Sequence, residues 1–356
     1  MSRIYFIDAL KTLAIFLVCY YHVSRVGYDI FDGRVLSYLN YFLHGAASFA
    51  VPLFFMISGY LLLPRAIDLK KHAYRTGKIY VLTLLWSAFF VMASIYLRDA
   101  QYSPVTFIKT TMFIKPGINN TLWFLFALVS VYILFPLTKL AFDQENKNIL
   151  YWMLGTLFVF SFASHAANWL WNALVFMRGH HVPEIKEKVF FNLQDVVPFA
   201  SYFYANVYFI IGGLLKDKVK TPLSSPALGG LIFFSLTALC IYGVMLSRIT
   251  GSIQDTVFPE YYSIPTFIGT TSIFILFMRH WNSGNKLVAS IGFNSLGIYL
   301  VHGTLSSVFR KYIMPSYAEY ETAALNYVYT TLLVLLSLAI VMALRRIPVA
   351  KELVRI

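Results

Sequence analysis

The amino-acid sequence predicts an all-α membrane protein with ten transmembrane helices and both termini in the cytoplasm. The first observation is composition: 58% of the 356 residues are hydrophobic and 13% are charged, whereas soluble domains carry about 25% charged residues. The second is an aromatic content of 18%, which suits a chain whose Trp and Tyr gather at membrane interfaces. The third is a series of long apolar windows. Together they exclude disordered, coiled-coil, collagen-like and ordinary globular proteins.

Ten windows are almost free of charged residues and are each about the length that crosses a bilayer, roughly 20 residues. They cover residues 4–23, 42–63, 79–97, 121–138, 149–171, 197–215, 227–247, 262–279, 287–308 and 325–344. The first could instead be a signal peptide, but Asp8 and Lys11 interrupt it and no small-residue cleavage site follows. We therefore expect a single domain over residues 1–356.

The basic excess indicates how the chain is oriented. Lys and Arg number 29 against 16 Asp and Glu, which gives a net charge of +13. When the N-terminus is placed in the cytoplasm, nearly all of this charge falls in cytoplasmic connections, as the positive-inside rule requires. An even number of spans then returns the C-terminus to the same side. No nucleic-acid partner is needed to explain the charge.

The first span carries a polar stripe. Lys11 and His22 are eleven residues apart, which places them within roughly 20° of each other on a helix and about 16 Å apart along it. Asp8 lies within about 40° of the same face and could pair with Lys11 at i,i+3. Ionisable groups inside a membrane helix indicate function by default. The stripe must face protein or a water-filled cavity.

His22 is the candidate catalytic base, because histidine can take and return a proton near neutral pH. The alternative is a buried histidine that bonds a backbone carbonyl. Asp8 and Lys11 have their own alternative, an ion pair that sets topology near the cytoplasmic interface.

The second span ends with Ser58 and Gly59, a pair that permits close helix packing. A strongly basic connection follows. Arg75 and Lys78 are i,i+3 at the start of the third span, so they project together and could hold phosphates from the cytoplasmic side. The alternative is that both serve only as positive-inside charge.

Later spans contribute two further aromatic or histidine positions. Trp123 opens the fourth span at the outer boundary, where a tryptophan is usually an interfacial anchor. The fifth to seventh spans and the tenth carry no formal charge, and the eighth carries only Arg279 at its end. In the ninth, His302 lies about 22 Å along a helix that begins near residue 287, at a depth like that of His22. A packing or hydrogen-bonding role is the alternative for His302.

No metal is expected. The adjacent His180 and His181 could bind one, but neither they nor the other histidines have partners at ligand spacing. The sequence has no H-E-x-x-H, no G-x-S-x-G and no phosphate-binding glycine loop, so the templates of soluble enzymes do not apply.

Five motifs in order over the ten spans resemble the acyltransferase-3 family of integral membrane acyltransferases. The motifs are a basic residue separated by ten residues from a histidine (Lys11 and His22, preceded by Asp8), residues 54–59, the basic pair Arg75 and Lys78, residues 122–125, and residues 295–302. Lys11 and Lys78 stand where Arg is more usual, and Val81 stands where many members have Pro. The hydrolase-like domain that longer relatives append is not expected.

The resemblance implies an O-acetyltransferase of the bacterial cytoplasmic (inner) membrane. It would move an acetyl or similar short acyl group from cytoplasmic acetyl-CoA to a sugar hydroxyl of a cell-surface polysaccharide, free or undecaprenyl-linked. The implied catalytic residues are His22, as base or transient acyl carrier, Lys11 and Asp8. The implied residues for acetyl-CoA are Arg75, Lys78 and Lys11, and those for the acceptor are Trp123, Tyr299 and His302.

Two alternatives stay open. A transporter or flippase of lipid-linked sugars would also use a polar stripe and basic mouths, although the chain shows no internal repeat. An N-acetyltransferase acting on an amino sugar would share the histidine chemistry. The sequence does not indicate an oligomeric state.

Overall fold

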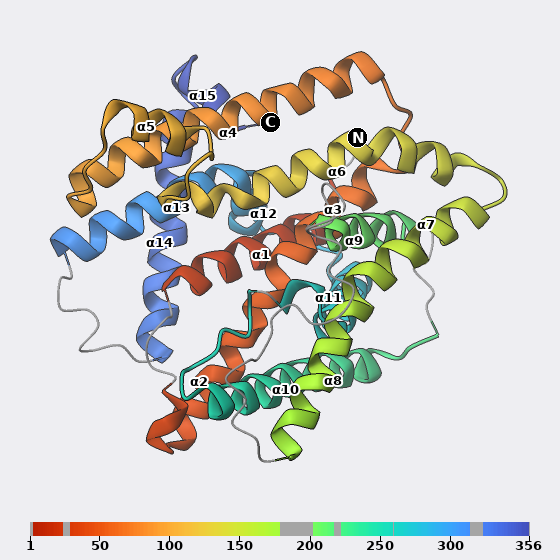
Figure 1. Cartoon of the computed structure of the whole chain (residues 1–356). Helices are drawn as coiled ribbons and strands as arrows, with labels where there is room; N and C mark the ends of the chain where they lie inside the picture. Colours follow the sequence, from red (N-terminus) through yellow and green to blue (C-terminus); the bar gives the residue numbers. More distant parts are fainter. Residues whose placement is uncertain are drawn as a thin grey trace.

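A computed structural model describes residues 3–23, 29–178, 202–216, 222–258, 260–313 and 323–355. All regular structure within these ranges is helical, with no strand (Figure 1). Seven of the described helices are long and apolar enough to cross a membrane, and an eighth crossing results if one bent pair counts as a span. A multi-pass helical membrane protein is therefore confirmed, while the count of ten spans stays a prediction.

Most predicted spans correspond to a long helix or to consecutive helical segments. These are α1 (Tyr5–Val23), α2 (Val35–His44) with η2 (Gly45–Phe49) and α3 (Ala50–Leu62), α4 (Leu69–Arg98), η3 (Ile118–Leu122) with α6 (Trp123–Asp143), α7 (Asn148–Phe158) with η4 (Val159–Ala163) and α8 (Ser164–Met177), α10 (Ser225–Thr250) and α14 (Ala323–Leu344). The shorter elements are α5 (Pro104–Thr111), α9 (Phe203–Leu214), η7 (Glu260–Tyr262), α11 (Ile264–His280), α12 (Lys286–Phe293), α13 (Ser295–Val308), η8 (Phe309–Ile313) and α15 (Ala350–Leu353).

The sixth and ninth predicted spans differ from the sequence prediction. For the sixth, 197–201 lie outside the described residues, and the described part is the short helix α9. For the ninth, the straight helix predicted over 287–308 is wrong, because α12 and the following helix meet at an angle of 77°. Asn294 lies at the break, where its amide donates to the carbonyl of Ser290 at 2.8 Å. A side chain that bonds the backbone in this way competes with helix continuation.

Helix α1 is the central element of the fold. It packs against α3, α11, α12, α13 and α14, and it lies in the middle of the bundle in Figure 1. Leu10, Ala14, Ile15 and Cys19 are fully buried on it. By contrast, only 17% of the apolar window in Asn148–Met177 is buried, so that segment exposes apolar side chains as lipid-facing helices do. Helix α1 therefore lies in the protein interior, with the residues of its polar stripe partly buried.

Helices α3 and α9 approach each other at backbone distance. A Cβ atom added to Gly59 would lie 1.7 Å from the carbonyl oxygen of Phe209, and one added to Gly212 would lie 2.0 Å from that of Met56. Small residues allow this contact between membrane helices. The close packing predicted at Ser58 and Gly59 is confirmed.

Both chain ends meet the junction of α12 and α13. Near the N-terminus, the guanidinium of Arg3 donates to the carbonyl of Ala289 at 2.7 Å. Near the C-terminus, Arg345 donates to the side-chain oxygen of Asn294 at 2.5 Å. The two ends therefore lie on the same side of the molecule, as an even number of spans requires. Their cytoplasmic location stays a prediction.

Candidate active site

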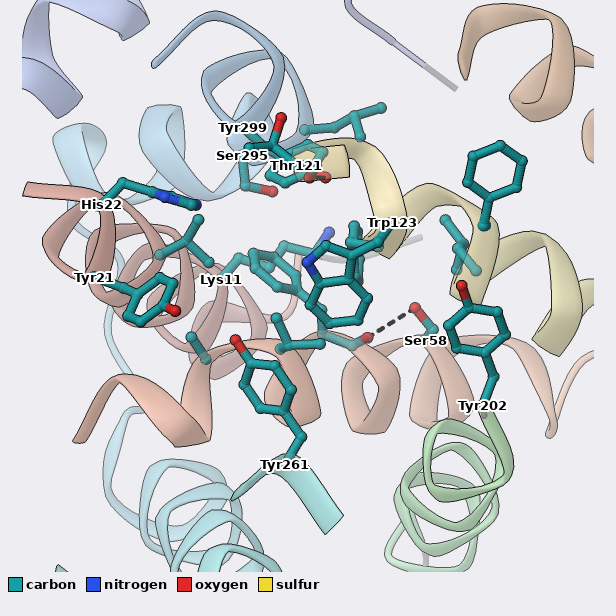
Figure 2. A pocket seen from close by; sticks show the side chains of 18 of the residues that line it. Lys11, Tyr21, His22, Ser58, Thr121, Trp123, Tyr202, Tyr261, Ser295 and Tyr299 are labelled. Atoms are coloured by element: carbon teal, nitrogen blue, oxygen red, sulfur yellow. Dashed lines mark hydrogen bonds between the residues drawn. The ribbon is translucent and has the colours of Figure 1, made fainter. Parts of the chain in front are cut away.

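A cavity of about 1080 Å³ lies between α1, α3, α6 and α13. Figure 2 shows His22 and Lys11 along one side of it, with Tyr299 above, Tyr261 below and Trp123 between them. The predicted polar stripe of α1 thus faces a cavity, because the residues at both of its ends, Lys11 and His22, line the same space.

Asp8 has a different partner from the one that its spacing suggested. Its carboxylate pairs with Arg3 at 2.6 Å, not with Lys11, and Asp8 does not line the cavity. Since Arg3 also bonds α12, this ion pair fixes the first turn of α1 against that helix. Lys11 keeps its ammonium group toward the cavity, where no acidic side chain belongs to the lining.

One end of the cavity is rich in guanidinium groups. Arg75 lines it, as predicted, and Arg345 and Arg355 line it too. Arg345 is held by Asn294 and lies 4.3 Å from the ring centroid of Phe293. From the sequence, Arg345 and Arg355 were interpreted only as positive-inside charge. Their position at the cavity depends on the C-terminal segment, which folds over α4 and α13.

Lys78 points elsewhere. Its ammonium donates to the carboxylate of Glu352 at 2.6 Å, and it is not among the lining residues. This hydrogen bond, together with the positive charge of Lys78, holds the pKa of Glu352 below its usual range. The basic pair predicted at the start of the third span is therefore divided: Arg75 faces the cavity and Lys78 anchors α15.

The other end of the cavity brings two histidines together. The ring centroids of His22 and His302 are 5.2 Å apart, which agrees with the predicted matching depth. Arg310 holds this end by donating to the carbonyl of His22 at 3.1 Å and to that of Val23 at 3.4 Å. These carbonyls belong to the last turn of α1, which lacks helical partners for them. The contact ties the end of α1 to η8, which follows α13.

Aromatic side chains complete the walls near His22. The ring of Trp123 lies 5.5 Å from that of Tyr261 and 5.7 Å from that of Phe258. Tyr299 donates its hydroxyl to the carbonyl of Thr121 at 2.6 Å, which joins α13 to the start of the α6 segment. The sequence prediction missed Tyr261 and Phe258, because nothing in their local pattern marks them as cavity residues.

A family model described as an acyltransferase domain (acyltransferase-3) matches residues 4–346. The chain belongs to the acyltransferase-3 family. No curated protein and no solved structure matches it. The family and the apolar helices together support a membrane acyltransferase.

This acyltransferase has a second cavity, of about 430 Å³, beside the first. His22, Asn120, Thr121 and Tyr299 line both cavities and form a common wall. His302 lines only the second. His22 therefore borders both spaces.

Metal chemistry has no ligand set in the described part of the acyltransferase, which contains no group of three or more His, Cys, Asp or Glu placed to hold an ion. His180 and His181 lie outside the described residues.

Proposed function

We propose that this acyltransferase moves an acetyl or similar short acyl group from cytoplasmic acetyl-CoA to a sugar hydroxyl of a cell-surface polysaccharide or its lipid-linked precursor. The observation that carries the proposal is one cavity with guanidinium groups at one end and a histidine at the other. Acetyl-CoA has matching ends, since its phosphates are anionic and its thioester lies at the tip of a flexible arm. The enzyme would work in the bacterial inner membrane.

The phosphates of CoA would be held by Arg75, Arg345 and Arg355. Guanidinium groups bind phosphate through paired hydrogen bonds, which makes arginine well suited to this task. Lys11 lies between the basic end and His22 along α1 and would contact the pantetheine arm or the thioester oxygen. Lys78 and Asp8 would act indirectly, by fixing α15 and the start of α1.

The chemical requirements of the transfer are modest, because the thioester is already activated. The acceptor hydroxyl must lose its proton, and the oxyanion that forms at the acyl carbon must be stabilised. His22 would serve as base or as transient acyl carrier. Trp123, Tyr299 and His302 would shape the acceptor side.

The test uses purified protein in liposomes, with radiolabelled acetyl-CoA and a lipid-linked glycan. Wild-type protein should label the glycan through an ester that mild base removes, and His22→Ala should lower the rate by about 10² to 10⁴-fold. A His22→Ala protein that folds, binds CoA and retains full transfer would contradict the role of His22. Glycan movement without label would favour a transporter, and a base-stable label would favour N-acetylation.

A further inference from the structure

One ring nitrogen of His302, Nε2, is buried without a hydrogen-bond partner in the described part of the chain. The other, Nδ1, lies 2.6 Å from the carbonyl oxygen of Tyr299. Because a carbonyl oxygen only accepts, Nδ1 must carry the proton, and Nε2 of the neutral ring is then an acceptor with a free lone pair. That Nε2 is buried and has no hydrogen-bond partner among the residues that the structure describes, and the residue as a whole is 4% exposed. An unsatisfied buried acceptor is costly and indicates a ligand.

The second cavity offers space for that ligand. His302 lines it together with Ser94, Thr121, Thr304, Ser306 and Ser307, whose hydroxyl groups suit a polyhydroxylated molecule. Gly303 also lines it, and a Cβ atom added there would meet nothing within 4 Å. Arg98 and Arg310, both exposed, complete the lining, so the cavity reaches the surface at the ends of α4 and η8.

We propose that the second cavity is the site of the acceptor sugar and that Nε2 of His302 is the base that takes its hydroxyl proton. This inference rests on the proposed function and deepens it. The hydroxyl oxygen bonds to the acyl carbon, its proton passes to Nε2, the carbon–sulfur bond breaks, and the proton then passes to the departing CoA thiolate. Nε2 ends as it began, neutral and bare. In this direct transfer His22, on the common wall, is left to position the thioester.

The first test is His302→Asn, a variant designed to keep the structural bond. An asparagine amide places an N–H near the position of Nδ1, so it can still donate to the carbonyl of Tyr299, but it has nothing at the position of Nε2. Membrane vesicles from the native cells supply the endogenous acceptor, and radiolabelled acetyl-CoA is the probe. At saturating acetyl-CoA the labelling rate should fall by about 10²-fold or more, while the Kd for CoA stays within about twofold.

Two further variants separate chemistry from folding. His302→Ala should regain part of its labelling when imidazole is added, since imidazole can enter the space that the ring leaves. Gly303→Leu should fill the second cavity and raise the KM for the acceptor without weakening CoA binding. The matched control is His280→Asn, because His280 is exposed, lines neither cavity and should tolerate the change.

The possible outcomes are distinct. His302→Asn with wild-type labelling overturns the inference, as does loss of CoA binding in that variant, which would make His302 structural. If wild-type vesicles transfer no label to any acceptor, the proposed function fails and the inference fails with it. If wild type transfers the label and His22→Ala does not, but His302→Asn labels as fast as wild type, then the inference alone fails and the proposed function stands.

Discussion

On α1, the position of a residue decides whether its charge is paired within the protein or faces the larger cavity. Asp8 is neutralised by Arg3, whereas Lys11, one turn further on, lines the larger cavity. The periodicity of the sequence predicted that Lys11 and His22 share a face, because that depends only on helix geometry. It could not predict the partner of Asp8, because Arg3 lies outside the helix and reaches it only through the fold of the N-terminal residues.

The first prediction concerns Lys11. Lys11→Met keeps the length of the side chain and removes the charge, so the KM for acetyl-CoA should rise by about tenfold or more, since a hydrogen bond to a charged group contributes about 1.5–3 kcal/mol. Steady-state kinetics with varied acetyl-CoA provides the measurement. Lys70→Met is the control, because Lys70 is exposed and lines neither cavity. An unchanged KM in Lys11→Met would remove Lys11 from the donor site.

The packing of the helices depends on single glycines, as between α3 and α9, and on one bend, between α12 and α13. The contact of α3 with α9 follows from glycines that the sequence shows directly. The bend between α12 and α13 was not predictable, because one Asn in an apolar window is tolerated by most membrane helices. Its effect depends on Arg345, more than 50 positions away. Tertiary contacts of this kind leave no local pattern.

The second prediction tests the contact between α3 and α9. Gly59→Ala should destabilise the protein by about 1–3 kcal/mol or prevent folding, because overpacked interiors force helices apart. Thermal unfolding in detergent and the yield of monodisperse protein report the effect. Gly155→Ala, in α7, is the matched control, since an added Cβ meets nothing within 4 Å there. Equal stability of the two variants would show that α3 and α9 can separate without cost.

The third prediction concerns the tether between α4 and α15. The pKa of Glu352 is lowered in the folded protein by its bond to Lys78. A lowered pKa stabilises the fold above the unfolded value, about 4.3, and the contribution is lost as pH falls through the folded value. Glu352→Gln should therefore unfold at a lower temperature than wild type at neutral pH, and this difference should shrink as the pH falls below the unfolded value and through the lowered folded value. If the difference in unfolding temperature between wild type and Glu352→Gln does not change with pH, the effect of the substitution comes from packing and not from the charge of Glu352.

At the scale of the whole molecule, the sequence predicted the class of fold and two residues of the candidate site, Arg75 and His22. The structure added that one cavity joins these two residues. Composition and apolar windows are strong signals, because the bilayer imposes them on every span. The two cavities and their common wall arise from contacts among α1, α6 and α13. No local pattern encodes such contacts, so Arg345, Arg355 and Tyr261 escaped prediction.

The fourth prediction concerns orientation. With both termini in the cytoplasm, Lys70 near the start of α4 faces the cytoplasm, and Gln101 beyond its end faces outward. In a variant without native cysteines, Gln101→Cys should react with a membrane-impermeant maleimide added to intact spheroplasts, and Lys70→Cys should react only after lysis. Both positions are exposed in the fold. The reverse pattern would invert the topology and place the guanidinium end of the larger cavity outside.

The common wall of the two cavities has a consequence for the permeability of the membrane. In the proposed orientation, the guanidinium end of the larger cavity lies toward the cytoplasm, and the smaller cavity is lined by the exposed Arg98 and Arg310 at the opposite end. What separates them is a partition of a few side chains, closed in part by the bond from Tyr299 to Thr121. Under the proposed function, the enzyme would have to let a short acyl group pass from one cavity to the other while it holds back ions. In this respect the fold has to satisfy the same sealing requirement as a closed channel.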